Sequence, residues 1–224
     1  MAETTLIIAD DHPLFRAALT EAVGRHLPGA RVIEASTLAT LQQAIAREPD
    51  VDLILLDLRM PGSESFASLA YLRTEHPAVP VVIVSASEEP RVVQRALDLG
   101  ASGFIPKSAN IETIGEMLHT VLAGGIAAPP LPQTASAAEA RDRELARRLA
   151  MLTPQQLKVL VMVAQGESNK SIGVALDITE ATVKAHITAI LRKLGLERRT
   201  QAAITAQRLL AAGPPGVDVA AEDD

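Results

Sequence analysis

The 224-residue sequence contains no cysteine and no tryptophan, and its only aromatic residues are three phenylalanines and one tyrosine. The absence of cysteine excludes disulfides, thiolate zinc sites and thiol catalysis. Hydrophobic cores must therefore be built from Leu, Val, Ile and Ala. No apolar run approaches the roughly 18 residues of a membrane-spanning helix, and no basic segment followed by an apolar one marks a secretory signal at the N-terminus. These absences predict a cytoplasmic protein that does not bind membranes.

Charge is distributed unevenly along the chain, which is long enough for two domains. Residues 1–124 contain 9 Lys and Arg against 16 Asp and Glu, whereas residues 151–212 contain 8 against 4. Residues 213–224 contain four acidic residues and no basic one. A nucleic acid would therefore be expected to bind 151–212, and the acidic tail 213–224 is predicted to be disordered.

Short runs of branched aliphatic residues alternate with amphipathic segments throughout residues 1–124. The runs predict strands at 5–9, 31–35, 51–57, 79–85 and 103–105. Helices are predicted at 13–26, 37–48, 90–99 and 111–123, with one more ending near 75. This alternation predicts an α/β domain with a five-stranded, doubly wound parallel sheet of the flavodoxin-like type.

Acidic residues stand where two of these strands end. Asp10 and Asp11 follow the first strand, and Asp57 ends the third. The carboxyl ends of parallel strands meet at one edge of the sheet, so three carboxylates there would repel one another unless a cation neutralised them. Oxygen ligands favour Mg²⁺, or Mn²⁺ in its place, which makes the site a candidate for phosphoryl chemistry.

Two further strand ends contribute polar groups to the same edge. Ser85 ends the fourth strand and Lys107 follows the fifth. Asp57 is the candidate nucleophile, because carboxylates can form aspartyl-phosphates, and Ser85 and Lys107 could hold the phosphoryl oxygens. Taken singly, such residues are more often turn formers or solvated surface groups. Their convergence on one edge favours a functional site.

The pattern of residues 5–124 resembles the receiver domain of two-component response regulators. The resemblance depends on Asp10-Asp11, Asp57 with Met60-Pro61-Gly62, Ser85-Ala86 and Gly103-Phe104-Ile105-Pro106-Lys107. It implies that Asp57 takes phosphate from a sensor histidine kinase and that Asp10, Asp11, Asp57 and the Arg59 main-chain carbonyl hold the metal. It also implies that Ser85 and Phe104 change position on phosphorylation. Ser63-Glu64-Ser65 departs from the family's usual turn.

A second module follows an Ala- and Pro-rich linker. The linker is expected to span 125–150, with a connecting helix in 137–150. Thr153, with Pro154 and Gln156, predicts a capped helix ending near Gly166. Ser168, Thr179 and Thr200 are expected to cap three more helices, ending near 175, 195 and 210. Two of these helices, joined by a three-residue turn, predict a helix-turn-helix within 151–212.

The helix after Thr179 has two distinct faces. Val183, Ile187, Ile190 and Leu194 form an apolar face, and Lys184, Ala185, Thr188 and Arg192 lie nearly opposite. Short or basic side chains of this kind can contact base edges, whereas Lys170, Lys193, Arg198 and Arg199 are placed for phosphates. A solvated face on a protein-binding bundle would show a similar pattern.

Residues 152–208 resemble the DNA-binding domain of LuxR-type regulators. The matching positions are Leu152-Thr153-Pro154, Gly166, Ser168-Asn169-Lys170, Ile172, Thr182-Val183-Lys184, His186, Leu191-Arg192-Lys193-Leu194-Gly195, Arg199-Thr200 and Ala202. The resemblance adds Thr182 to the DNA-contacting set. Gln156 and Ser171 stand where the family usually has Glu, so ion pairs expected within the bundle are absent. With the receiver, this arrangement is similar to NarL/FixJ-type response regulators.

The sequence therefore predicts a transcription regulator that binds double-stranded DNA under control of phosphorylation, as a homodimer when phosphorylated. The linker would allow the recognition helix either to lie masked against the receiver or to be released. One alternative is a phosphate-independent DNA-binding regulator with a non-signalling receiver. Another is a magnesium-dependent phosphatase, which leaves the helix-turn-helix unexplained.

Overall fold

The first part of the chain forms a five-stranded parallel sheet with the order β2-β1-β3-β4-β5. The computed structural model describes residues 4–62, 66–131 and 137–210, so both the Ser63–Ser65 turn and the 213–224 tail lie outside the described residues. The strands are β1 (Thr5–Ala9), β2 (Arg31–Ala35), β3 (Leu53–Asp57), β4 (Val81–Ser85) and β5 (Gly103–Pro106). β4 begins two residues later than predicted. Pro80 has no N–H to donate to a ladder hydrogen bond.

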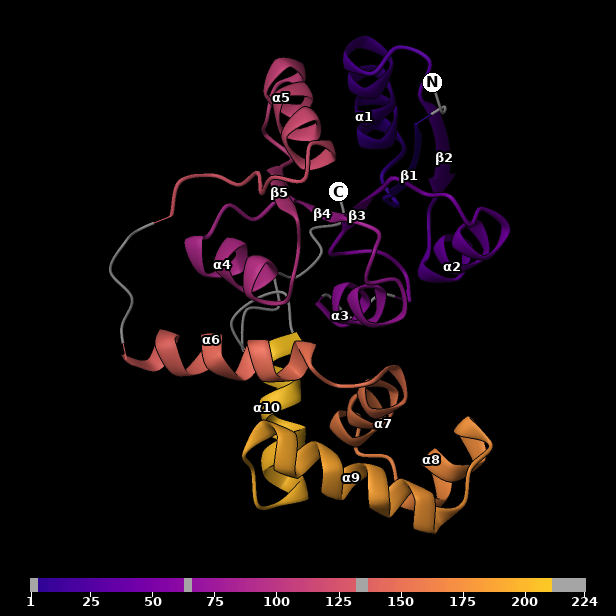
Figure 1. Ribbon diagram of the computed structural model, residues 1–224, viewed down its shortest axis with the longest axis vertical. Helices are drawn as coiled ribbons and strands as arrows, with labels where there is room; N and C mark the ends of the chain where they lie inside the picture. Colours follow the sequence, from indigo (N-terminus) through magenta and orange to yellow (C-terminus); the bar gives the residue numbers. More distant parts are fainter. Residues whose placement is uncertain (1–3, 63–65, 132–136, 211–224) are drawn as a thin grey trace, which may run out of the picture.

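Helices cover both faces of this sheet (Figure 1). α1 (Pro13–His26) and α5 (Ile111–Leu122) pack on one face, and α2 (Leu38–Arg47), α3 (Phe66–Glu75) and α4 (Pro90–Asp98) pack on the other. Alternate strand residues face opposite cores, so that Leu53 and Leu55 pack toward α1 and α5 while Ile54 and Leu56 pack toward α2 to α4. The predicted doubly wound α/β fold is confirmed.

The second part of the chain is helical. Its elements are α6 (Ala137–Ala150), α7 (Pro154–Ala164), α8 (Asn169–Leu176), α9 (Glu180–Leu194) and α10 (Arg199–Leu210). The predicted caps at Thr153, Ser168 and Thr179 are confirmed, because each side chain accepts the N–H of the residue three positions later. The predicted Thr200 cap is wrong. α10 begins at Arg199, and the Gln201 side chain accepts the N–H groups of Glu197 and Arg198 instead.

The turn between α8 and α9 depends on a close backbone approach. A Cβ atom on the buried Gly173 would lie 2.8 Å from the Ile178 carbonyl oxygen, so only glycine fits at this point of α8. Asp177 ends α8 in the left-handed conformation, with φ +53°. Together these residues bring α8 and α9 into the helix-turn-helix arrangement.

The chain between α5 and α6 returns to the sheet before it leaves the first domain. Ala127 pairs with Gly103 as a parallel bridge, and the Phe104 N–H donates to the Ala127 carbonyl at 2.8 Å. Residues near 127, which were expected to belong to the linker, thus extend the edge beside β5. α6 packs against α3 and α4, α7 and α10 pack against α3, and these three helices lie between the sheet domain and α8 and α9 (Figure 1).

Candidate metal centre and nucleic-acid interface

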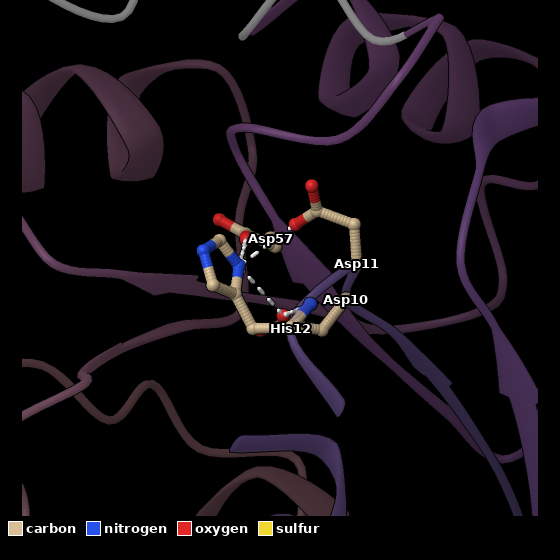
Figure 2. Close-up of side chains that lie close together, drawn as sticks. All are labelled: Asp10, Asp11, His12 and Asp57. Carbon is tan, nitrogen blue, oxygen red and sulfur yellow. Dashed lines mark hydrogen bonds and ion pairs between the residues drawn. The ribbon is translucent and has the colours of Figure 1, made fainter. Parts of the chain in front are cut away.

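Three carboxylates lie together at the carboxyl ends of β1 and β3. These strands are neighbours, with Ala9 paired to Leu56, so Asp10 and Asp57, which follow those residues, stand side by side. Asp10 is 1% exposed and Asp57 3%, whereas the Asp11 side chain is 31% exposed. Figure 2 shows their carboxylates converging on one point of the edge. The fold thus brings together three acidic residues from positions 10, 11 and 57.

Lys107 neutralises part of this charge. Its Nζ atom lies 2.8 Å from both Asp57 Oδ2 and Asp10 Oδ2. Its main-chain N–H donates to the Ser85 carbonyl at 2.8 Å, which fixes the residue beside the end of β4. One ammonium group among three carboxylates leaves a net negative charge at the site.

The charged state of Asp57 is disfavoured by its surroundings. Burial raises the pKa of Asp57 above the usual aspartate value, and the nearby Asp10 carboxylate adds to the increase. Hydrogen bonds from Lys107 and from the Arg59 N–H act in the opposite direction without cancelling it. For Lys107, burial alone would lower the pKa, but its contacts with Asp10 and Asp57 raise it. A second cation beside Asp57 would stabilise the charged form of its carboxylate.

Two buried carboxylate oxygens support a cation site here. Asp10 Oδ2 lies 2.8 Å from Lys107 Nζ and Asp11 Oδ1 lies 2.8 Å from His12 Nδ1, and neither oxygen accepts any other hydrogen bond among the described residues. Buried carboxylate oxygens are ordinarily satisfied by hydrogen bonds or by a metal. One ligand atom each from Asp10, Asp11, His12 and Asp57 lies within 4.8 Å of all the others. This oxygen-rich set fits a divalent cation such as Mg²⁺.

His12 also belongs to this cluster, although it was not among the predicted site residues. Its Nδ1 atom lies 2.8 Å from Asp11 Oδ1 and 3.8 Å from Asp57 Oδ2 (Figure 2). Its main-chain N–H donates to Asp10 Oδ1 at 2.7 Å. The available signal was its position immediately after the Asp10-Asp11 pair.

The other predicted site residues of the sheet domain occupy different surroundings. The buried Ser85 hydroxyl accepts the Ser87 N–H at 3.1 Å, at the end of the strand next to Asp57. Phe104 is fully buried in β5, within the core cluster that contains Val92 and Ala96 of α4. The Arg59 N–H donates to Asp57 Oδ1 at 3.0 Å, which places its peptide beside the acidic cluster.

The predicted base-contacting residues share the outer face of α9. Lys184, Ala185, Thr188 and Arg192 are all exposed, and Val183, Ile190 and Leu194 on the other side are buried. Thr182 at the start of the helix is also exposed, with its N–H bonded to Thr179. Lys170 projects from α8 with its side chain exposed. A contiguous polar and basic face is therefore open to a ligand.

Two of the predicted phosphate contacts are bound within the domain instead. Lys193 Nζ donates to Gln156 Oε1 at 2.8 Å and to the Met151 carbonyl at 3.1 Å. Arg199 donates to Asn169 Oδ1 at 2.6 Å and to the Glu167 carbonyl. Gln156 stands where the family usually has Glu, so a hydrogen bond from Lys193 takes the place of an ion pair at this position. Both cations brace the helical bundle in this arrangement.

The sheet domain covers α6, α7 and α10 rather than the outer face of α9. Lys158 of α7 pairs with Glu75 of α3 at 3.1 Å and lies over the Tyr71 ring. Arg95 of α4 donates to the Arg208 carbonyl of α10 at 3.0 Å. The receiver therefore does not mask the recognition helix in this structure. Apolar residues of α7 and α10 pack in one cluster with those of α3 instead.

Comparisons with known proteins agree with both halves of the fold. The response regulator receiver domain family matches residues 6–119, and the luxR family of bacterial regulatory proteins matches residues 150–206. The chain is a NarL-type response regulator. It is 42% identical to a glycerol metabolism activator of Pseudomonas putida over 207 residues, covering 90% of this chain and 94% of the relative. It is 33% identical over 202 residues to the nitrate/nitrite response regulator protein NarL of Escherichia coli K12, covering 89% and 93%.

Solved structures show the same fold at lower identity. A structure of two RcsB dimers bound to two parallel DNAs matches with a TM-score of 0.53 at 20% identity, covering 91% of this chain and 98% of the other. An RcsB–DNA complex matches with a TM-score of 0.51 and the same coverage.

Membership of this family makes the protein a phosphorylation-controlled, DNA-binding regulator of transcription. The family is regulatory, which argues against the phosphatase alternative. Within the described residues, no helix has the length and apolarity needed to cross a bilayer.

Proposed function

We propose that Asp57 accepts a phosphoryl group from a sensor histidine kinase. The observation that supports this most strongly is the position of Asp57, a 3% exposed carboxylate that contacts Lys107 and lies beside Asp10 and Asp11. In the transfer, an Asp57 carboxylate oxygen forms a bond to phosphorus, and the bond between phosphorus and the kinase imidazole nitrogen breaks. The imidazole leaves with the electron pair of that bond and takes up a proton.

The surrounding residues position the transferred group. Asp10, Asp11, Asp57 and the Arg59 carbonyl would hold Mg²⁺ or Mn²⁺, which supplies neutralising charge for the phosphoryl oxygens. Lys107 already contacts Asp57 Oδ2 at 2.8 Å and can follow the phosphoryl oxygens. The Ser85 hydroxyl accepts a hydrogen bond from Ser87 and can donate its own proton to the phosphoryl group. A shift of Ser85 would let the buried Phe104 repack against α4.

Incubation with acetyl phosphate and Mg²⁺ tests this assignment. Intact-mass spectrometry should show one added phosphoryl group in the wild type, and none with Asp57→Asn or without a divalent ion. Lys107→Ala should slow the labelling. Equal labelling of Asp57→Asn would assign the phosphate to another residue.

We further propose that α9 enters the major groove of double-stranded DNA. Lys184 would contact a guanine edge, with Ala185, Thr188 and Arg192 beside it on the exposed face. Thr182 and Lys170 would contact the sugar-phosphate backbone. Lys193 and Arg199 can contribute to phosphate binding only if their present bonds to Gln156 and Asn169 are shared or given up.

Phosphorylation is proposed to control DNA binding through the α3–α4 surface. This surface holds α7 and α10 by the Lys158–Glu75 and Arg95–Arg208 contacts, which fix the orientation in which the exposed side of α10 could meet a second copy of the chain. Repacking of Phe104 and α4 on phosphorylation would weaken these contacts and release the helical domain to dimerise. The base-contacting face is exposed throughout, so dimerisation rather than unmasking of α9 would be the controlled step.

A DNA-binding titration of the full-length protein with and without beryllofluoride and Mg²⁺ tests the coupling. Beryllofluoride should tighten binding to the target promoter about tenfold to hundredfold, within the range typical of allosteric coupling. Asp57→Ala should remove the response. Equal affinity under both conditions would instead support a phosphate-independent regulator, an alternative that the exposed face of α9 permits.

A further inference from the structure

His12 occupies a position in the acidic site that is close to all three carboxylates. Its Nδ1 atom lies 2.8 Å from Asp11 Oδ1, 3.4 Å from Asp10 Oδ1 and 3.8 Å from Asp57 Oδ2. The side chain is 64% exposed, and its Nδ1 atom also lies 3.5 Å from Nζ of Lys107, the cation that contacts Asp10 and Asp57. Its placement is therefore determined by the acidic site rather than by hydrophobic packing.

The spacing of these atoms is compatible with one shared ion. Mg²⁺ and Mn²⁺ bind ligands at roughly 2.1 Å, so two ligands on opposite sides of one ion are about 4.2 Å apart. One atom from each of Asp10, Asp11, His12 and Asp57 lies within 4.8 Å of the others, which requires only small shifts to reach a common centre. Three oxygen donors and one nitrogen donor can thus converge.

The imidazole also explains why Asp11 keeps a buried oxygen without any other hydrogen bond. Asp11 Oδ1 lies 2.8 Å from His12 Nδ1, and both atoms face the space beside Asp57 (Figure 2). A cation placed there would bond to both atoms and would remove the need for their mutual contact. The main-chain bond from His12 to Asp10 holds the imidazole next to this position.

We propose that His12 is a fourth side-chain ligand of the metal site and that it shifts the site's preference from Mg²⁺ toward transition-metal ions. Imidazole nitrogen suits Zn²⁺, Fe²⁺ and Ni²⁺, whereas Mg²⁺ and Mn²⁺ prefer carboxylate oxygens and water. The proposal depends on the metal site of the proposed function and adds a ligand to it. The protein would be loaded by a transition-metal ion at concentrations where Mg²⁺ alone binds weakly.

Electron paramagnetic resonance of full-length protein loaded with Mn²⁺ tests this directly. Electron spin echo modulation from ¹⁴N should appear in the wild type and disappear in His12→Phe. The Ni²⁺ affinity of His12→Phe should fall by about tenfold to hundredfold or more, at least the loss that follows removal of an outer-shell partner, while Mg²⁺ affinity measured by calorimetry changes less than about threefold. His119→Phe removes an exposed histidine of α5 and should leave both affinities and the nitrogen signal unchanged.

The outcomes separate this inference from the proposed metal site. Mn²⁺ bound to wild type without a nitrogen signal, or equal loss of Ni²⁺ and Mg²⁺ affinity in His12→Phe, would overturn the role of His12 and leave the carboxylate site intact. Asp10→Asn should weaken both ions. Failure of the wild type to bind either ion would overturn the proposed metal site and this inference together.

Discussion

Asp57 illustrates how a reactive residue can lower the stability of its own fold. Its pKa is raised mainly by burial, so the folded state holds the Asp57 proton more tightly than the unfolded chain does. Stability from this residue is therefore lost as the pH rises from about 3.8 through the raised pKa of the folded state. The binding of a cation, or the reaction of the carboxylate with a phosphoryl group, would be favoured because it offsets this unfavourable charge.

Replacement of Asp57 by asparagine should therefore stabilise the apoprotein. We expect Asp57→Asn to raise Tm at pH 7 by about 2–4 °C, the shift that roughly 1 kcal/mol produces in a protein of this size. Thermal unfolding followed by circular dichroism in the absence of divalent ions should show this gain. The gain should shrink toward pH 3, where both states carry the proton; a constant gain across pH would contradict the charge explanation.

Three lysines of the helical domain have different surroundings and should respond differently to substitution. Lys184→Ala should lose about 1–3 kcal/mol on the target DNA and relax preference at one base pair. Lys170→Ala should weaken all sequences equally and reduce the salt dependence of binding. Lys193→Ala should instead lower Tm, because it removes the bonds to Gln156 and Met151. Fluorescence anisotropy on target and scrambled duplexes distinguishes them; a sequence-independent effect of Lys184→Ala would contradict its groove position.

At the scale of the element, α10 has both buried and exposed residues on the side that its sequence predicts for dimerisation. The sequence places Ala203, Ile204, Gln207 and Leu210 along one side that could pair two copies. In the structure Leu210 is buried, Ala203 is half-buried and Gln207 donates to the Ala164 carbonyl, whereas Ile204 is 65% exposed. Ile204 is thus the large apolar residue of this side that remains available for a partner.

Ile204→Glu should prevent α10 pairing without unfolding the domain. Two glutamates facing one another in a symmetric interface repel, so the beryllofluoride-loaded protein should no longer protect two half-sites about one helical turn apart. Footprinting should show single half-site protection with reduced affinity. Ile126→Glu changes another exposed apolar residue, in the first domain, and should leave the two-site footprint intact. An unchanged footprint for Ile204→Glu would place the dimer contact elsewhere.

At the scale of the whole molecule, the interface between the domains combines a buried apolar cluster with a few ion pairs. The cluster continues from α3 and α4 into α7 and α10. Around it, Lys158 pairs with Glu75, and Arg143 lies 3.8 Å from Asp98. Partly exposed ion pairs contribute little to stability. They therefore suit a contact between the domains that, as proposed above, opens when α4 moves.

Charge reversal at this interface should change basal DNA binding. Glu75→Lys places two ammonium groups together and should raise the affinity of the unphosphorylated protein for its promoter about twofold to fivefold, equivalent to less than about 1 kcal/mol. The double variant Glu75→Lys with Lys158→Glu restores the pair and should return affinity to the wild-type value. Small-angle scattering should show a larger radius of gyration only for the single variant. Equal affinity of all three proteins would separate this interface from DNA binding.

The sequence by itself determined both domains, the order of their elements and most of their caps. Alternating aliphatic runs specify buried parallel strands, and residues such as Thr153 and Ser168 cap helices through contacts only three positions away. The edge where Asp10, Asp57 and Lys107 meet also followed, because parallel strands must end at the same edge.

Only the tertiary structure decided which partners the long polar side chains choose. His12 joins the carboxylates, and Lys193 and Arg199 brace the bundle, because their nitrogen atoms lie near oxygens that are distant in the sequence. The same holds for the receiver surface, which packs on α7 and α10 and leaves the outer face of α9 exposed. These outcomes depend on how two apolar surfaces fit together, a property that no local pattern of residues contains.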